Sequence, residues 1–192
     1  MLLVTLDTNV LGSALARIRK AIIGLDVQIA YTTVTYRELG ARLPSIYPDG
    51  VVAETGVYDE SHYDSGAVYG EQTVVETLTI GESRLGFAAL GEDASPSRFE
   101  AILYVIGNGS FPKLGARENL TRGERKQLRD AMILEAHARE RRDILVSDDA
   151  KAYVGKDGKR RLTLEAAART RIMTVDEFVA HATELCASHA PI

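Results

Sequence analysis

Leu2-Leu3-Val4-Thr5-Leu6-Asp7-Thr8-Asn9, at the start of the chain, is the stretch that decides the fold. Apolar residues run from position 2 to position 6 with one threonine among them, which is typical of a strand covered on both faces in a parallel sheet. Asp7 follows at the carboxyl end of that strand, the edge where open α/β sheets form their ligand crevice. A structural role is equally open, because Asp7 or Thr8 could cap the helix expected at residues 10–20. The stretch therefore predicts a buried strand that carries a carboxylate to one edge of a parallel sheet.

The composition is that of a globular domain with an ample core. The chain has 192 residues, of which 45% are hydrophobic and 26% charged, and its formal net charge is −4. A negative total leaves any nucleic-acid binding to local basic clusters. The single cysteine, Cys186, excludes an internal disulfide, and the four histidines lack the short spacing of zinc ligands. No apolar run has the length of a membrane span and no signal-peptide pattern precedes the first strand, so we expect a cytoplasmic protein without a membrane partner.

Strand and helix patterns alternate over most of the chain. Beyond the first strand, strands are expected at residues 27–32, 144–146 and 171–174. Helices are expected at residues 10–20, 95–106, 121–142, 164–169 and 174–187, and Thr33 or Thr35 can start a further one. A basic turn is expected at residues 156–161. The alternation predicts the α/β class, with a central parallel sheet wrapped by helices.

Residues 44–91 interrupt this alternation. Glycine, tyrosine, serine and aspartate become frequent, and the helical periodicity weakens. Residues 51–58 and 72–80 read as strands separated by a polar turn, so we expect an inserted β-hairpin or loop region.

Two acids inside the expected helices admit both structural and functional interpretations. Glu38 stands three residues after Thr35, which fits a capping box, yet it also follows a strand end and could face the same crevice as Asp7. Asp130 lies in an otherwise apolar turn, where a carboxylate is costly unless a cation or hydrogen-bond donors meet it. The structural alternative for Asp130 is a partly exposed side chain paired with Arg129 or a neighbouring residue.

A fourth acid, Asp149 or its neighbour Asp148, follows the strand expected at residues 144–146. Strand ends and the helix starts that follow them share one edge of a parallel sheet, so Asp7, Glu38, Asp130 and Asp149 can converge there. Converging carboxylates repel one another and persist only if they are protonated or neutralised. An all-oxygen set suits Mg²⁺ or Mn²⁺ better than zinc, and such a centre can hydrolyse phosphodiesters.

The four acids lie in motifs that occur in a fixed order along the chain. These motifs are Leu6-Asp7-Thr8-Asn9, Tyr36-Arg37-Glu38-Leu39, Asp130-Ala131-Met132-Ile133-Leu134 and Leu145-Val146-Ser147-Asp148-Asp149. The ordered set resembles the PIN-domain family of nucleases, including the family's Thr/Ser-x-Asp pattern and the interval between its third and fourth acids. The resemblance covers roughly residues 1–43 and 120–187.

The resemblance implies a single PIN-like domain over residues 1–192, with the insertion at about 44–91. It implies a ribonuclease that hydrolyses RNA with a metal-activated water, using Mg²⁺ or Mn²⁺ held by the catalytic residues Asp7, Glu38, Asp130 and Asp149. Asn9 and Ser147 would orient these ligands or bound water, with Asp148 as the alternative to Asp149. Family habit also suggests an antitoxin or other protein partner and a homodimer.

Other functions remain open at this stage. The same fold could be a non-catalytic module that binds RNA or protein through its insertion and its basic residues. The insertion has no counterpart in the family's small toxin nucleases, which leaves the substrate undetermined. Phosphoryl transfer on another α/β fold is a third possibility. Asn9 argues against the haloacid-dehalogenase pattern, which needs a second aspartate at that position. No glycine-rich loop in the sequence ends in Lys-Ser/Thr, which argues against P-loop chemistry.

Overall fold

The computed structural model describes residues 1–32, 34, 35, 38, 57–58, 68–69, 96–113, 116–117, 119–155 and 157–188. Within these ranges no helix is both long enough and apolar enough to span a membrane.

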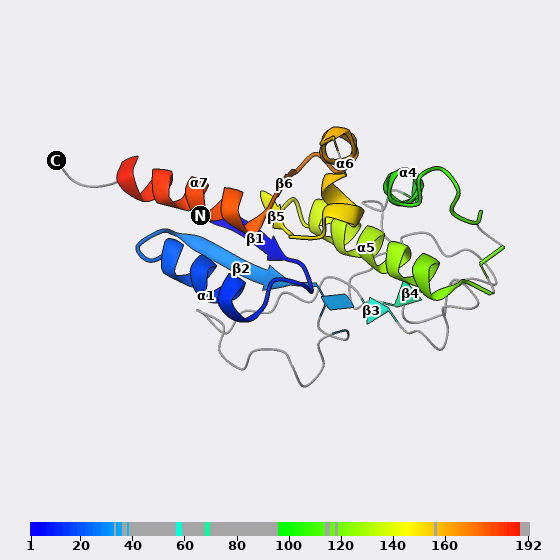
Figure 1. Cartoon of the computed structure of the whole chain (residues 1–192), viewed down its shortest axis with the longest axis horizontal. Helices are drawn as coiled ribbons and strands as arrows, with labels where there is room; N and C mark the ends of the chain where they lie inside the picture. Colours follow the sequence, from blue (N-terminus) through cyan, green and yellow to red (C-terminus); the bar gives the residue numbers. More distant parts are fainter. Residues whose placement is uncertain are drawn as a thin grey trace.

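A four-stranded, all-parallel sheet forms the centre of the fold, in the order β2-β1-β5-β6 (Figure 1). The strands are β1 (Leu2–Leu6), β2 (Val27–Tyr31), β5 (Ile144–Val146) and β6 (Arg171–Met173). Leu6 lies opposite both Tyr31 and Val146, and Val146 lies opposite Met173, so all four strands end at the same level. The predicted α/β class with a parallel sheet is confirmed.

Helices cover both faces of this sheet because the strand side chains alternate between two apolar layers. Val4, Leu6 and Val146 point into the layer that contains α1 (Gly12–Ala21) and α7 (Val175–Ser188). Leu145 and Ile172 point into the opposite layer, with α4 (Pro96–Ile106), α5 (Arg122–Arg139) and α6 (Lys159–Ala168).

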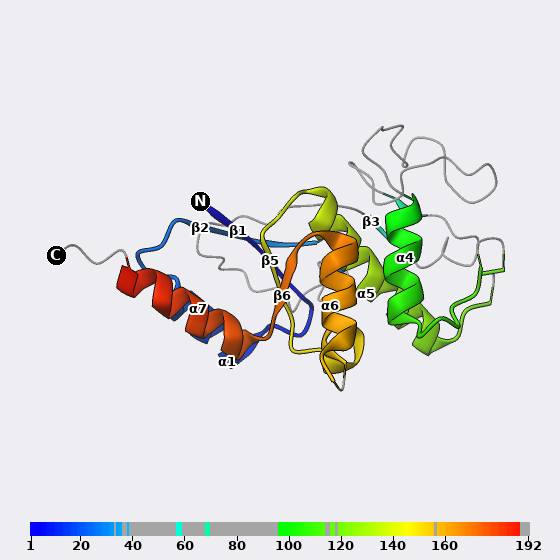
Figure 2. The ribbon, with the colours of Figure 1, turned by 90° about the horizontal axis from the view of Figure 1, so that it is seen from above.

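The three helices of the second layer pack against one another, as Figure 2 shows. Arg160, near the start of α6, contacts Asn108, just beyond the end of α4, so α4 and α6 run in opposite directions. This layer therefore has two ends, one beside the carboxyl ends of the strands and one beside their amino ends.

The helix boundaries follow local signals that the sequence contains. The Thr121 side chain accepts a hydrogen bond from the Glu124 amide, and the Glu124 side chain accepts one from the Thr121 amide, so the two residues form a capping box at the start of α5. Thr174 and Glu177 make the same reciprocal pair at the start of α7. In contrast, α6 begins at Lys159, so the second half of the basic stretch predicted as a turn is helical.

The region predicted as an insertion contributes one short described hairpin. β3 (Val57–Tyr58) pairs antiparallel with β4 (Val68–Tyr69). The hairpin prediction is thus supported at residues 57–58, whose partner is 68–69, whereas the strand predicted at 72–80 lies outside the described residues.

Candidate metal centre

The carboxyl ends of β1 and β5 bring Asp7 and Ser147 together. The Asp7 amide donates to the Val146 carbonyl oxygen at 3.0 Å, and the Ser147 hydroxyl donates to Oδ2 of Asp7 at 2.6 Å. The Thr8 amide donates to the other oxygen, Oδ1, at 2.7 Å. Asp7 is only 3% exposed, so its carboxylate is buried in a fixed orientation at the strand end.

The electrostatics of Asp7 reflect both its burial and its acidic neighbours. Burial raises the pKa of Asp7 to about 6, although the hydrogen bonds from Ser147 and Thr8 favour the charged form. The charges of Glu38 and Asp149 raise the pKa further. The Asp7 carboxyl is therefore in electrostatic range of two other predicted ligands.

Ser147 also connects Asn9 to the acidic turn after β5. Its Oγ accepts a hydrogen bond from the Asp149 amide at 3.0 Å and lies 3.4 Å from Nδ2 of Asn9. The Asn9 side-chain oxygen accepts a hydrogen bond from the Asp148 amide at 3.3 Å. These contacts put Asn9 and Ser147 beside the acids that they were predicted to orient.

The two adjacent aspartates point to different parts of the protein. Oδ1 of Asp148 accepts a hydrogen bond from the Val175 amide at 2.9 Å, at the start of α7. Asp149 instead faces α5, with its Oδ2 2.5 Å from Nζ of Lys126. Burial acts to raise the pKa of Asp149, but the hydrogen bonds from Lys126 and from the Ala152 amide outweigh it and lower the pKa. The geometry therefore favours Asp149 over Asp148 as the acid of the cluster.

Asp130 comes from the middle of α5 and is 8% exposed. Within the described part of the chain, no group donates a hydrogen bond to its carboxylate. Burial, followed by the charge of Asp7, raises the pKa of Asp130 to about 8, and the charges of Asp149 and Glu38 act in the same direction. The Tyr153 hydroxyl donates to the backbone carbonyl oxygen of Asp130 at 2.8 Å, which ties this turn of α5 to the segment after Asp149.

Glu38 completes the group from the segment after β2. Its Oε2 accepts a hydrogen bond from the Thr8 hydroxyl at 2.6 Å, and its Oε1 accepts from Nη1 of Arg129 at 2.9 Å. Glu38 is thus held between the end of β1 and α5. The amide of Thr35, its predicted capping partner, donates to the Thr32 hydroxyl at 3.2 Å.

We refer to Asp7, Glu38, Asp130 and Asp149 as the acid cluster. As they stand, no three His, Cys, Asp or Glu side chains within the described ranges are arranged to hold a metal ion. Lys126 contacts Asp149 and Arg129 contacts Glu38, so basic side chains neutralise two of the four acids. The chemistry nevertheless fits a hard divalent cation, because the donors are all oxygens and the buried Asp130 carboxylate has no donor.

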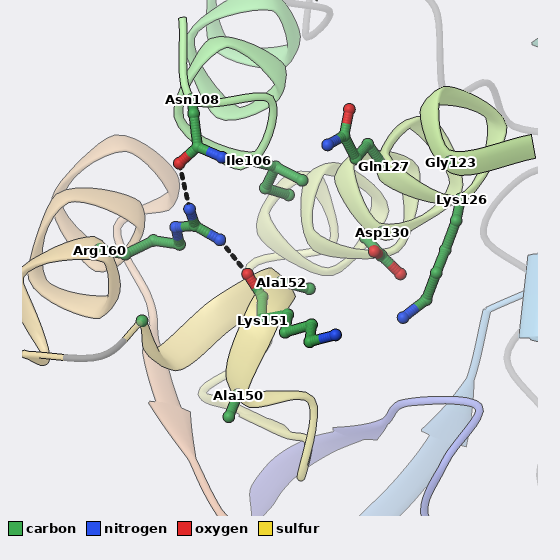
Figure 3. Close-up of a pocket in the computed structure, with 11 residues that line it drawn as sticks. Ile106, Asn108, Gly123, Lys126, Gln127, Asp130, Ala150, Lys151, Ala152 and Arg160 are labelled. Atoms are coloured by element: carbon green, nitrogen blue, oxygen red, sulfur yellow. Dashed lines mark hydrogen bonds between the residues drawn. The ribbon is translucent and has the colours of Figure 1, made fainter. Parts of the chain in front are cut away.

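A basic pocket of about 660 Å³ opens beside the acid cluster. Figure 3 shows the side chains of Lys126, Asp130 and Lys151 directed toward the same space. The Arg160 guanidinium lines the pocket and donates to the Lys151 carbonyl oxygen and to the Asn108 side-chain oxygen. This basic pocket is lined by residues from α4, α5 and α6 and from the segment between β5 and α6.

Sequence reasoning missed Lys151 and Tyr153. Both lie in a single π-helical turn, η2 (Ala150–Val154), whose first amides are capped by Oδ1 of Asp149. The one available signal was the position of Asp149 directly before a short segment, since aspartate is a preferred capping residue. Of the basic residues in the stretch expected as a turn at 156–161, Arg160 lines the pocket, Arg161 pairs with Glu177 and Lys156 lies outside the described residues.

Comparisons with protein-family models, with curated proteins and with solved structures found no match for this chain.

Proposed function

We propose that the chain is a divalent-metal-dependent ribonuclease with a PIN-like fold. The observation that carries this proposal is the buried Asp130 carboxylate, which receives no hydrogen bond from the described residues and whose pKa is raised to about 8. A carboxylate in that state, next to three other acids, is stabilised by a cation with free coordination positions. The parallel sheet with helices on both faces is compatible with the PIN-like fold.

The acid cluster would hold Mg²⁺ or Mn²⁺. When bound, the ion would neutralise the carboxylates, polarise a phosphodiester and make an attacking water more acidic. Ser147 and the Thr8 amide fix the orientation of Asp7 before any ligand arrives. Such preorganisation avoids the cost of ordering the acid during the reaction.

Lys126 and Arg129 exchange partners in this proposal. In the structure their charges meet Asp149 and Glu38. Once a cation neutralises those carboxylates, both basic side chains can turn toward phosphate oxygens of the substrate. Lys126 also lines the basic pocket, where Lys151 and Arg160 could hold neighbouring phosphates of an RNA strand.

The first test is calorimetric titration of Mn²⁺ into the metal-stripped protein and into Asp7→Asn, with circular dichroism of both. We expect saturable binding by the wild type and its loss in a variant that is still folded. Cleavage of RNA in excess Mn²⁺ should fall by at least about a hundredfold in the same variant, because metal-assisted catalysis contributes several kcal/mol. Near wild-type cleavage by folded Asp7→Asn would contradict the proposal.

Asp148→Asn and Asp149→Asn form a matched pair for the same assays. Each substitution removes one negative charge from the same turn. Asparagine keeps a side-chain oxygen that can accept hydrogen bonds from backbone amides. Because Asp148 faces the start of α7 and Asp149 faces Lys126, only Asp149→Asn should lose metal binding and cleavage. Equal losses in both variants would mean that the net charge of the turn matters and not a ligand position.

One observation favours a second function, a metal-free module that binds nucleic acid. Lys126 and Arg129 already neutralise half of the acid cluster without any ion. In that case RNA would bind in metal-free buffer, Mn²⁺ would not bind, and no cleavage would follow its addition. The titration therefore separates the two functions before any substrate is identified.

A further inference from the structure

A second pocket, of about 640 Å³, lies at the other end of the same helical layer. Six arginines line it, and none of its lining residues in the described part of the chain is a lysine or an aromatic residue. The arginines are Arg98, Arg139, Arg141, Arg142, Arg169 and Arg171. We call this site the arginine pocket. The proposed nuclease function makes no use of it.

The topology explains how the arginine pocket is assembled. α5 ends at Arg139 and α6 ends at Ala168, while β6 begins at Arg171. The pocket therefore collects two helix ends at the amino edge of the sheet, opposite the edge that carries Asp7. Arg98 reaches it from the first turn of α4, which runs antiparallel to α6.

The arginine pocket has more basic than acidic side chains, although Arg98 pairs with Glu135 and Arg139 pairs with Glu140. The two acids in its lining, Asp143 and Glu165, accept hydrogen bonds from backbone amides of strands. The Leu3 amide donates to Asp143 at 2.7 Å, and the Ile172 amide donates to Glu165 at 2.8 Å. Three of the arginines are exposed and form no ion pair with any residue that the structure describes. These are Arg141, Arg169 and Arg171.

Arg142 is a buried arginine in the lining of the pocket. Its side chain is 6% exposed, and its Nη2 donates to the carbonyl oxygens of Val4 and Gln28 at 3.0 Å each. Its Nε is buried and has no hydrogen-bond partner in the described part of the chain. A buried donor without a partner is costly, and an anion in the pocket is one group that could satisfy it.

Two of the exposed arginines adopt a backbone conformation that favours glycine. The φ angle is +50° at Arg141 and +52° at Arg169, each just beyond a helix. The negative end of a helix dipole accounts for a cation at such a position. It does not account for the absence of glycine, which would relieve the left-handed strain at both sites. Strain retained at two neighbouring positions suggests a role for the side chains.

We propose that the arginine pocket binds a compact anion made of linked phosphate groups, either inorganic or part of a nucleoside triphosphate. The planar guanidinium group matches the paired oxygens of phosphate, and the three exposed arginines together carry more positive charge than one carboxylate or one phosphate requires. The volume suits a small ligand. The described residues of its lining include no aromatic ring, so they offer no stacking surface for the bases of an RNA strand.

The test is calorimetric titration of inorganic tripolyphosphate into the full chain in metal-free buffer. Arg141→Gly and Arg169→Gly should each weaken binding by about tenfold or more, because each removes a charge-assisted contact. Both variants should keep or raise the midpoint temperature of unfolding, because glycine relieves the strain. A loss of affinity together with undiminished stability cannot be attributed to poor folding.

Two charge-matched controls locate the binding. Lys20→Gln removes an exposed charge from the last turn of α1, and Lys151→Gln removes one from the basic pocket. Both should bind tripolyphosphate as the wild type does. Weakening in Lys151→Gln with no change in the arginine variants would place the anion in the basic pocket and overturn the proposal.

Three further titrations identify the ligand class. A nucleoside triphosphate that binds as tightly as tripolyphosphate supports recognition of the phosphate chain alone, and tighter binding supports additional contacts to the nucleoside. A ten-residue polyglutamate peptide, or a single-stranded RNA, that binds more tightly than tripolyphosphate and loses that affinity in Arg141→Gly would overturn the proposal in favour of a macromolecule. Absence of tripolyphosphate binding would also overturn it.

Discussion

The two ends of the layer formed by α4, α5 and α6 handle charge in opposite ways. At the carboxyl edge of the sheet, Asp7 and Asp130 are buried, and their pKa values are raised first by this burial and then by the charges of neighbouring acids. At the amino edge, three of the six arginines are exposed, so water screens the repulsion between them. One helix, α5, contributes to both ends, with Asp130 in its middle and Arg139 at its last turn.

The acid cluster is a strained arrangement of like charges, whereas the arginine pocket is charged without the same strain. Like charges cost little at an exposed surface and much in a buried one, since the effective dielectric constant falls on burial. The acid cluster is therefore the end whose stability should respond to pH and to a cation. The arginine pocket should respond to added anions with little effect of pH, because arginine stays charged throughout the accessible range.

The largest expected effect is the response of Asp130→Asn to pH. A folded-state pKa raised to about 8 for Asp130, and to about 6 for Asp7, gives stability that is complete below about pH 4 and is lost as the pH rises through those values. In metal-free urea unfolding, the loss between about pH 5 and pH 9 should be smaller in Asp130→Asn by roughly 3–5 kcal/mol.

Arg141→Gly is the control for that experiment, because it removes a charge from the opposite end of the layer. Its stability should change with pH as that of the wild type does. If the pH profiles of Asp130→Asn and the wild type coincide, the acid cluster is not strained and the contrast between the two ends fails.

The next effect concerns a buried ion pair at the arginine end. Nη2 of Arg98 lies 2.7 Å from Oε1 of Glu135, whose side chain is 0% exposed. Arg98→Gln removes the positive partner of a buried carboxylate, which should cost roughly 3 kcal/mol of unfolding free energy at neutral pH. Urea unfolding measures this loss, and the double variant Arg98→Gln/Glu135→Gln should recover part of it. A single variant as stable as the wild type would show that burial does not govern the cost of charge at this end.

The positions of the strand-end residues could be predicted from sequence because a parallel sheet fixes where its strands end. Leu2–Leu6 identifies β1 by composition alone, and Asp7 must then lie at the carboxyl edge. The capping boxes at Thr121 and Thr174 were equally visible, since their partners lie only three residues away.

The choice between Asp148 and Asp149 could not be made from sequence. It depends on the π-helical turn after β5, which directs Asp149 toward Lys126 and leaves Asp148 to bind the start of α7. The same turn brings Lys151 to the basic pocket, and a five-residue turn leaves no periodic pattern to detect.

The arginine pocket was invisible for a different reason. Its residues lie at positions 98, 139–142 and 169–171, on elements brought together by the packing of α4 against α5 and α6 and by the pairing of β5 with β6. Local composition describes each as an ordinary surface arginine near a helix end. Contacts between elements distant in sequence bring them to one site.

The smallest expected effect is that of Arg17→Gln on the free energy of unfolding. This variant tests whether the contribution of an ion pair depends on its burial or only on its charge. Arg17 pairs with Asp176 across α1 and α7, and the two side chains are 53% and 81% exposed. Such a pair gains little, because water screens it and both side chains lose conformational freedom. Urea unfolding of Arg17→Gln should therefore change by less than about 0.5 kcal/mol, several times less than Arg98→Gln in the same assay. Both variants remove one arginine from one ion pair, so the difference between them measures burial directly. Equal losses of unfolding free energy in the two variants would mean that the exposed Arg17–Asp176 pair contributes as much stability as the buried Arg98–Glu135 pair.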